Sequence, residues 1–234
     1  MAPSLTTYFQ ADAHTSFNTV QYSKLQSTDP SCSGAKQAGV EVQLQNIPLP
    51  PVFSNKYEER EYLEGRLTLA FRVFGKFGFN EGVAGHITLR DPIMTDHFWV
   101  NPLGTPFSLM RKSDLILVNK DGEVVDGGSN RLLNKAAYMI HHAIHVARPD
   151  VNCAAHSHSL YGQTFCTLGH PIDMLTQDSC VFYKDLAVYR QFKSAVLAKE
   201  EEENIAAALG GKNACLLQNH GLLTVVQTVE SAIF

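Results

Sequence analysis

Residues 152–158, Asn-Cys-Ala-Ala-His-Ser-His, are the stretch that decides both the fold and the chemistry of this chain. They follow the helix-stopping pair Arg148-Pro149 and predict a β-strand. In a strand, residues i and i+2 lie on one face, with Cα atoms roughly 6.5–7 Å apart. His156 and His158 therefore project to the same side, where both imidazoles can bind one metal ion with bonds of about 2.0–2.1 Å.

A third histidine completes the constellation. His220 lies between Asn219 and Gly221, after a predicted strand over 214–217, where a bend of the backbone can direct a side chain into a cleft. Three imidazoles with open coordination positions are typical of a catalytic metal site rather than of a closed structural one. A single His-x-His pair is also common among structural histidines. Spacing alone therefore leaves a metal site and a structural role equally open.

The rest of the pattern predicts an α/β domain after a tail. Residues 1–50 are rich in polar residues without periodicity, so we expect a disordered or extended tail that has too little apolar surface to offset ordering entropy. Residues 51–234 are expected to form one domain. Helices are predicted over 57–74, 134–147, 160–168 and 194–209, and strands over 84–89, 98–100, 115–118, 123–125, 152–158, 214–217 and 222–226.

Composition excludes several classes of protein. The 234 residues carry 19 Lys and Arg against 23 Asp and Glu, a formal charge of −4, so a nucleic acid partner is not expected. No apolar run approaches the roughly 20 residues that span a bilayer. The first residues show no basic segment followed by an apolar block, so we do not expect a secretory signal. Five cysteines without a Cys-x-x-Cys pair are expected to be reduced in a cytoplasmic protein. Residues 229–234 begin an apolar helix without an exit signal, so we expect that the natural chain continues beyond them.

The predicted helix over 134–147 carries a polar stripe opposite an apolar face. The stripe consists of Asn134, Tyr138, His141, His145 and, just after the helix, Arg148. The i, i+4 spacing of His141 and His145 also occurs in metal sites. The favoured interpretation is a polar flank that lines a cleft or an interface.

Three motifs, in this order, resemble the class II aldolase/adducin family, in its fungal, adducin-like branch. They are Gly-Val-Ala-Gly-His-Ile-Thr-Leu-Arg-Asp at 82–91, Ala-Arg-Pro-Asp-Val-Asn leading to His-Ser-His at 147–158, and Gln-Asn-His-Gly-Leu at 218–222. The resemblance covers the chain from about Tyr57 to the end. It implies an α/β fold, a class II aldolase-like α/β/α sandwich with a central, mostly antiparallel sheet, assembled as a homotetramer. It also implies a divalent metal, zinc in the first place with iron or manganese as alternatives, held by His156, His158 and His220.

The chain departs from this family at the catalytic acid. Sugar-phosphate aldolases of the family carry a catalytic glutamate on the helix before the His-x-His strand, and alignment through Arg148-Pro149-Asp150 places Ala137 there. Dehydratase members instead place a glutamate after that strand, in a zone that holds Asp178. We therefore nominate Asp178 as general acid or base, with a helix or strand cap as the equally weighted alternative. Tyr183 is a weaker candidate for proton delivery.

The substrate-binding residues are also expected from the resemblance. The phosphate-binding loop of the aldolases resembles the segment that contains Gly128 and Ser129 only in part. His86 replaces an asparagine that helps to bind phosphate, and Thr88 follows it in the same motif. A half-buried structural histidine is an equal interpretation for His86. A phosphorylated substrate is therefore less secure than the metal.

Three functions are compatible with these residues. The first is a metal-dependent lyase, in which the metal stabilises charge that develops as a C–C or C–O bond breaks in a small hydroxy-carbonyl substrate. The second is an iron oxygenase with three histidines, as in a few members of the fold. The third is a non-catalytic, adducin-like interaction module, which would have no reason to keep three converging imidazoles. The lyase is favoured, and the identity of the bound metal would separate the three.

Overall fold

The computed structural model describes residues 50–191 and 199–233. The chain divides between Val52 and Phe53, and the unit from Phe53 onward holds the described helices and strands. The expected tail, residues 1–50, lies outside the described residues except for its last residue. The tail and the domain boundary at residue 50 therefore stay predictions.

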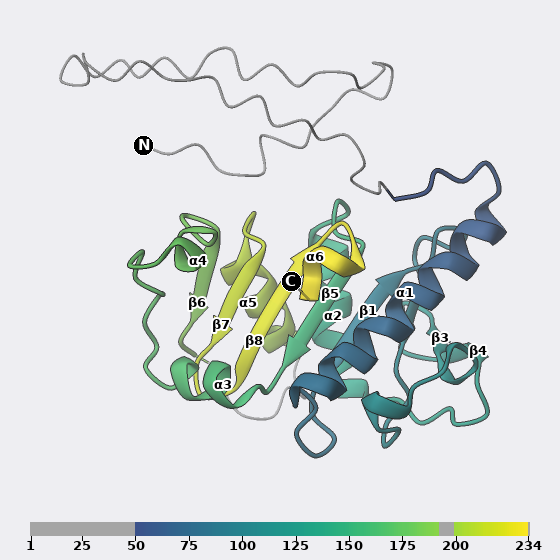
Figure 1. Cartoon of the computed structure of the whole chain (residues 1–234), viewed down its shortest axis with the longest axis horizontal. Coiled ribbons are helices and arrows are strands. Elements are labelled where there is room, and N and C mark those ends of the chain that lie inside the picture. Colours follow the sequence, from purple (N-terminus) through teal and green to yellow (C-terminus); the bar gives the residue numbers. More distant parts are fainter. Residues whose placement is uncertain (1–49, 192–198, 234) are drawn as a thin grey trace, which may run out of the picture. The chain divides into compact units, whose positions relative to one another are not determined.

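Eight strands form one sheet at the centre of this unit (Figure 1). They are β1 (His86–Arg90), β2 (Phe98–Val100), β3 (Ile116–Val118), β4 (Val124–Gly127), β5 (Cys153–Ser157), β6 (Leu186–Tyr189), β7 (Ala214–Leu217) and β8 (Gly221–Val226). Their order is β4-β3-β2-β1-β5-β8-β7-β6. Only β6 and β7 pair in parallel, which confirms the expected mostly antiparallel sheet.

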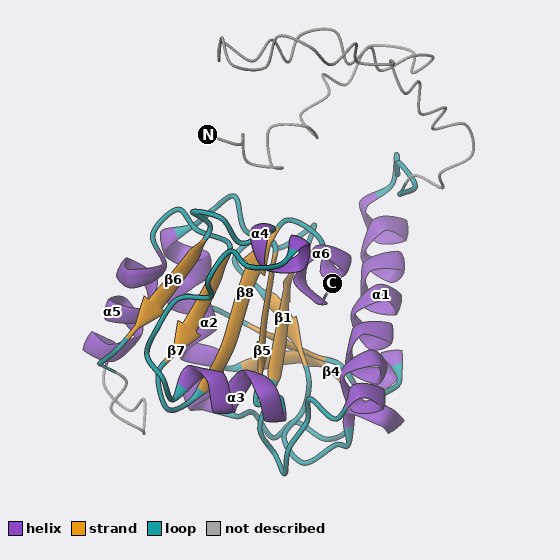
Figure 2. Cartoon of the chain, turned by 60° about the vertical axis from the view of Figure 1, so that its left-hand side comes forward, coloured by secondary structure: helices purple, strands orange, loops and turns teal. Residues whose placement is uncertain are grey.

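Helices cover both faces of the sheet. They are α1 (Lys56–Phe77), α2 (Lys135–Ala147), α3 (Leu160–Cys166), α4 (Gln177–Cys180), α5 (Lys199–Leu209) and α6 (Val229–Ile233), with 3₁₀ turns at Phe107–Leu109 and Lys112–Asp114. Helices α1 and α6 pack on one face, and α2 and α5 pack on the other (Figure 2). This arrangement confirms the α/β/α sandwich. Within the described ranges, no helix has the length and apolar character needed to cross a membrane.

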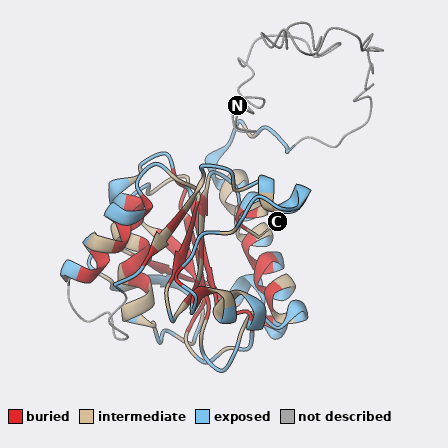
Figure 3. Cartoon of the chain, turned by 90° about the vertical axis from the view of Figure 1, so that its left-hand side faces the viewer, coloured by how far each residue is buried: buried red, intermediate tan, exposed pale blue. Residues whose placement is uncertain are grey.

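The core follows the two-residue period of the strands. In β5, Cys153 and Ala155 pack under α1, whereas Ala154 packs with α2 on the opposite face. Figure 3 shows this burial in the central strands and on the helix sides that face them. Because both faces are covered, β5 is buried along its whole length. The residue that follows Ala154 on the α2 face is His156.

Helix α1 agrees with the sequence pattern except at its end. It begins after Asn55, whose side chain accepts a hydrogen bond from the Tyr57 backbone N–H, and it ends at Gly78 with a φ of 74°. The sequence predicts an end at residue 74, but the helix continues through Gly75 to Phe77. A Cβ atom on Gly75 would lie 2.5 Å from the Ser108 backbone nitrogen. The glycine therefore permits close packing and does not end the helix.

Two elements were not expected from the sequence. The sequence pattern predicted neither β6 nor α4. Strand β6 is a four-residue run whose partner β7 lies 28 residues further along the chain, and α4 is a single turn of four residues. The predicted helix over 160–168 is shorter, ending at Cys166. The helix predicted over 194–209 is seen from Lys199, because residues 192–198 lie outside the described residues.

A buried carboxylate ties α1 to the first hairpin of the sheet. The side chain of Asp91 is fully buried, and its Oδ1 accepts hydrogen bonds from Arg60 Nη2 (2.7 Å), Ile93 N (2.9 Å) and Met94 N (2.6 Å). Its Oδ2 accepts a hydrogen bond from Trp99 Nε1 at 2.8 Å. Burial alone would raise the pKa of Asp91, but these hydrogen bonds together hold it below its usual value. The carboxylate is therefore ionised at neutral pH.

We predict that Asp91→Asn lowers the free energy of unfolding at pH 7 by about 3 kcal/mol, because it leaves the Arg60 guanidinium without its counter-charge. The folded-state pKa of Asp91 is lowered, so its stabilisation is present above the unfolded pKa and is lost as pH falls through the folded one. Urea unfolding at pH 7 and pH 3 should show the difference from wild type shrinking at the lower pH. The control, Asp96→Asn, removes an exposed carboxylate beside His97 and should cost less than about 0.5 kcal/mol. Equal losses in both variants would contradict this role of Asp91.

Candidate metal centre

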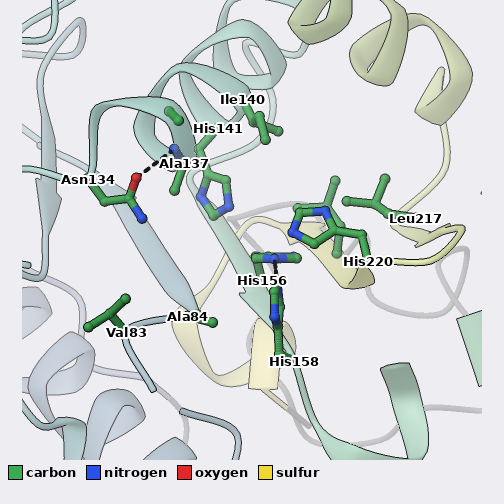
Figure 4. A pocket seen from close by; sticks show the side chains of 13 residues that line it. Val83, Ala84, Asn134, Ala137, Ile140, His141, His156, His158, Leu217 and His220 are labelled. Carbon is green, nitrogen blue, oxygen red and sulfur yellow. Dashed lines mark hydrogen bonds between the residues drawn. The ribbon is translucent and has the colours of Figure 1, made fainter. Parts of the chain in front are cut away.

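Three imidazoles converge at one end of β5. The possible ligand nitrogens of His156, His158 and His220 all lie within 4.8 Å of one another. The ring centroids are 4.8 Å apart for His156 and His158, 4.6 Å for His156 and His220, and 4.7 Å for His158 and His220. Figure 4 shows the three rings side by side. The expected convergence of these three residues is therefore what the fold produces.

The position of His156 is set by the strand. It pairs with His86 of β1 and Leu223 of β8, and its Nδ1 donates a hydrogen bond to the Leu222 carbonyl oxygen at 2.8 Å. A neutral imidazole has one N–H, so Nε2 carries the lone pair. This Nε2 lies 2.9 Å from Nε2 of His158, one residue beyond the end of β5. A carbonyl partner that orients the ring is the usual arrangement for a metal-binding histidine.

The position of His220 is set by a tight turn between β7 and β8. The His220 N–H donates to the Leu217 carbonyl oxygen at 3.0 Å, and Asn219 has a φ of 60°. A turn that needs a positive φ at its third residue favours Gly or Asn there. The next residue is Gly221, where a Cβ atom would lie 2.4 Å from the Ser157 carbonyl oxygen and within 3.2 Å of His156 and His158 ring atoms. Only glycine permits this contact between turn and strand.

Burial keeps the cluster neutral. Burial, followed by the neighbouring His220 and His158, lowers the pKa of His156 well below its usual value. Burial and then His158 lower the pKa of His220 to about 4. Burial also lowers the pKa of His158, against the opposing charge of Glu81. Neutral imidazoles offer lone pairs to a metal, so the donor set fits a divalent ion such as zinc.

A cavity of about 270 Å³ adjoins the cluster. Among the described residues that line it there is no carboxylate and no Lys or Arg. The lining consists of Val83, Ala84, Gly85, Asn134, Ala136, Ala137, Ile140, His141, His156, His158, Leu217, His220 and Leu223.

The helix α2 supplies one wall of this cavity. Asn134, Ala137 and His141, at spacings of three and four residues, share the helix face that is turned to the cluster (Figure 4). The Asn134 side chain caps the helix, and its Oδ1 accepts a hydrogen bond from the Ala137 N–H at 3.2 Å. Ala137, where the family resemblance predicts the aldolase glutamate, therefore lies at the cavity. The i, i+3, i+7 spacing was the signal that could have placed Asn134 and His141 here.

The polar stripe of α2 is turned inward. It was expected to line a cleft or an interface: His141 lines the cavity, whereas His145 is buried in the core. Tyr138, His141 and His145 are buried against the sheet. Thr88 Oγ1 lies 3.0 Å from His141 Nδ1 and 2.8 Å from His145 Nε2, so polar groups of sheet and helix satisfy one another. Periodicity shows that a helix is two-sided, but it does not show that a polar side will find partners in the core.

The nominated acid–base residues lie elsewhere in this chain. Asp178 is exposed in the first turn of α4, and Tyr183 is partly exposed just before β6. Both precede the start of β6, whereas His220 follows the end of β7. Because β6 and β7 run parallel, the two groups lie at opposite ends of these strands (Figure 1). This chain therefore does not bring Asp178 or Tyr183 to its own cavity.

The expected substrate-binding residues do not line the cavity either. His86 is buried beside His141, with ring centroids 5.0 Å apart, and Thr88 is buried beneath the same ring. Gly128 follows the edge strand β4, and Ser129 next to it is exposed. A Cβ atom on Gly128 would lie 2.7 Å from the Ser113 carbonyl oxygen, so this glycine permits close packing of the chain.

Comparison with known proteins agrees with this geometry. Residues 65–234 match the family model of the class II aldolase and adducin N-terminal domain. The chain is 44% identical over 184 residues to the meiotically up-regulated gene 14 protein of Schizosaccharomyces pombe, covering 79% of this chain and 71% of that protein. It is 45% identical over 185 residues to a 4-hydroxy-3-prenylphenylpyruvate oxygenase/4-hydroxy-3-prenylbenzoate synthase of Streptomyces roseochromogenus, covering 78% and 66%.

A solved structure shares the fold. It is described as L-fuculose 1-phosphate aldolase from Glaciozyma antarctica, with a TM-score of 0.73 and 49% identity, covering 79% of this chain and 72% of that one. The family model matches more than half of the chain, and its span includes the three clustered histidines. By sequence and by fold, this chain belongs to the class II aldolase and adducin family.

Proposed function

We propose that this chain is a metal-dependent, lyase-type enzyme that acts on a small hydroxy-carbonyl substrate. The observation that carries the proposal is the convergence of His156, His158 and His220 beside a cavity of about 270 Å³. Three protein nitrogens leave a fourth coordination position for water or substrate, as in catalytic zinc sites. Zinc is the metal proposed, with iron or manganese as alternatives.

Different residues would have different roles at such a site. A divalent metal, when bound, polarises a carbonyl oxygen and stabilises negative charge on it. The three histidines would hold the metal, and the Leu222 carbonyl orients one of them. Ile140, Leu217 and Leu223 give the cavity apolar walls that exclude water, which strengthens electrostatic interactions within it.

An iron oxygenase is the second candidate. The cavity lining has no carboxylate among the described residues, so the acid–base glutamate of an aldolase has no counterpart on α2. A relative at 45% identity is named as an oxygenase and synthase. A non-catalytic, adducin-like module is not favoured, because it would gain nothing from three buried, converging imidazoles.

Assembly of several chains is also proposed, as a cytoplasmic homotetramer. Large apolar side chains are exposed at the start of α3, namely Leu160 (71% exposed) and Tyr161 (86%), and before α4, where Leu175 is 86% exposed. Large exposed apolar groups typically mark interaction surfaces. The tetramer is proposed from the family resemblance, and these side chains are candidate contacts within it.

We predict that His156→Ala abolishes metal binding with little change in fold. Loss of a direct ligand should weaken binding by more than the roughly 10–100-fold cost of losing an outer partner. Elemental analysis of the purified protein checks this, with the exposed His170→Ala as the matched control. Zinc in the wild type would support the lyase, and iron would support the oxygenase. No bound metal in the wild type would contradict both.

Gly221→Ala should weaken metal binding although residue 221 has no side chain to coordinate a metal. The added Cβ would meet the Ser157 carbonyl and the rings of His156 and His158, so the rings must shift. We expect a loss of about tenfold or more in metal affinity, by analogy with outer-shell changes. Gly211→Ala is the control, since a Cβ there would meet nothing within 4 Å. Unchanged affinity in Gly221→Ala would show that the turn does not determine the cluster geometry.

The wild type should be a poor aldolase for fuculose- or rhamnulose-type phosphates. Ala137 lines the cavity but cannot move a proton, and general acid–base help is typically worth 10²–10⁴-fold. Ala137→Glu should therefore raise the rate of retro-aldol cleavage of L-fuculose 1-phosphate, measured as product formed per unit time. Ala137→Gln is the matched control of similar size without an ionisable group. Brisk cleavage by the unmodified protein would refute the argument.

A further inference from the structure

A chain of hydrogen bonds runs from the loop before β5 to the cavity beside the histidine cluster. His145 Nδ1 lies 3.2 Å from the Val151 carbonyl oxygen, and His145 Nε2 lies 2.8 Å from Thr88 Oγ1. The same hydroxyl oxygen lies 3.0 Å from His141 Nδ1. All three side chains are buried. The hydrogen-bond chain therefore ends on the His141 ring, which lines the cavity.

The donor and acceptor groups allow only one direction of donation along these hydrogen bonds. The Val151 carbonyl only accepts, so His145 Nδ1 carries the hydrogen and donates it. Burial, followed by the charge of Arg90, lowers the pKa of His145 to about 3, so the ring is neutral and its Nε2 is an acceptor. The Thr88 hydroxyl has one hydrogen and donates it to that Nε2. Its oxygen is then left to accept from His141 Nδ1–H.

These hydrogen bonds determine whether the second ring nitrogen of His141, Nε2, carries a hydrogen. Because Nδ1 carries the hydrogen and the ring is buried, the Nε2 atom of His141 has a lone pair. Thr88 does not line the cavity and His141 does, so Nε2 is the ring nitrogen left to face it (Figure 4). His141 does not belong to the group of three clustered nitrogens, so this lone pair is separate from the ligand set.

The same helix face also carries a hydrogen-bond donor. Asn134 Oδ1 is committed to the Ala137 N–H, which leaves the amide NH₂ as the group that Asn134 can offer to the cavity. The wall formed by α2 thus presents an acceptor, His141 Nε2, and a donor, Asn134 Nδ2. Ala137 between them is small and leaves space in front of both (Figure 4).

We propose that His141 is a substrate-binding residue whose Nε2 accepts a hydrogen bond from a free hydroxyl group, so that the site selects hydroxy-carbonyl compounds over analogues that lack the hydroxyl. The inference rests on the proposed function for its substrate class, but the state of His141 does not depend on the metal. Asn134 Nδ2 would bind an acceptor oxygen of the same substrate. A buried acceptor left unpaired by the wrong compound disfavours that compound.

The first test reads the imidazole directly. In the metal-free, full-length protein with ¹⁵N-labelled histidine, long-range ¹H–¹⁵N spectra distinguish a protonated from an unprotonated ring nitrogen. We expect Nδ1–H with bare Nε2 for both His141 and His145, with signals assigned by His141→Phe and His145→Phe. Thr88→Val should abolish this preference at His141, and Thr88→Ser, which keeps the hydroxyl, should retain it. A protonated Nε2 on His141 in the wild type would overturn the proposal.

The second test uses small probes in the same metal-free protein. Hydroxyacetone carries the hydroxyl, whereas acetone and methoxyacetone do not donate a hydrogen bond. We expect hydroxyacetone to bind roughly fivefold more tightly than either, and to shift the His141 Nε2 signal, since one neutral hydrogen bond is worth about that much. The preference should vanish in His141→Phe. Equal affinities, or no shift at Nε2, would overturn the role of His141, whereas absence of metal from the purified protein would count against the proposed function alone.

Discussion

The register of β5 between β1 and β8 is the constraint on which the site depends. Pairing of His86 with His156, and of His156 with Leu223, sends the His156 ring to the sheet face that α2 covers. A slip of one residue would turn that ring toward α1 and would expose Ala155 to the cavity. The same register brings the turn before β8 against the end of β5, and Gly221 permits that contact at a distance no other residue allows. The histidine cluster is thus a product of strand pairing.

The polar interior beneath the cluster is stable because its members satisfy one another. A buried imidazole costs little when both ring nitrogens have partners, and the Val151 carbonyl and Thr88 hydroxyl supply three of the four partners needed by His145 and His141. The fourth position, Nε2 of His141, is at the cavity, where a ligand can supply what the protein does not. Structural satisfaction and ligand selection therefore arise from the same hydrogen-bond chain.

The cavity differs from an aldolase site in one decisive respect. Ala137, where the family resemblance predicts the catalytic glutamate of the aldolases, lines the cavity beside the imidazoles. Three neutral nitrogens without a carboxylate in the described lining give a bound divalent ion a higher net charge than a site with glutamate would. Such an ion is a stronger electrophile, but proton transfer must then come from the substrate, from water or from another chain. Two relatives that share close to half of the sequence are named for different reactions, which is consistent with one fold that carries different chemistry.

Much of this molecule follows from local sequence. The two-residue period places His156 and His158 on one side, and the Asn219-His220-Gly221 sequence predicts a bend that carries the third histidine. Asn134 begins α2 because its side chain caps the helix. Local sequence also predicted the long helix α1, apart from its passage through Gly75. Contacts between distant segments decided the rest. Parallel pairing of β6 with β7 separates Asp178 and Tyr183 from the cluster, and only the packing of α2 on β1 shows that His141 and His145 point inward to Thr88. The physical reason is that periodicity reports which residues share a face, whereas the partner of that face is set by chain segments more than fifty residues away.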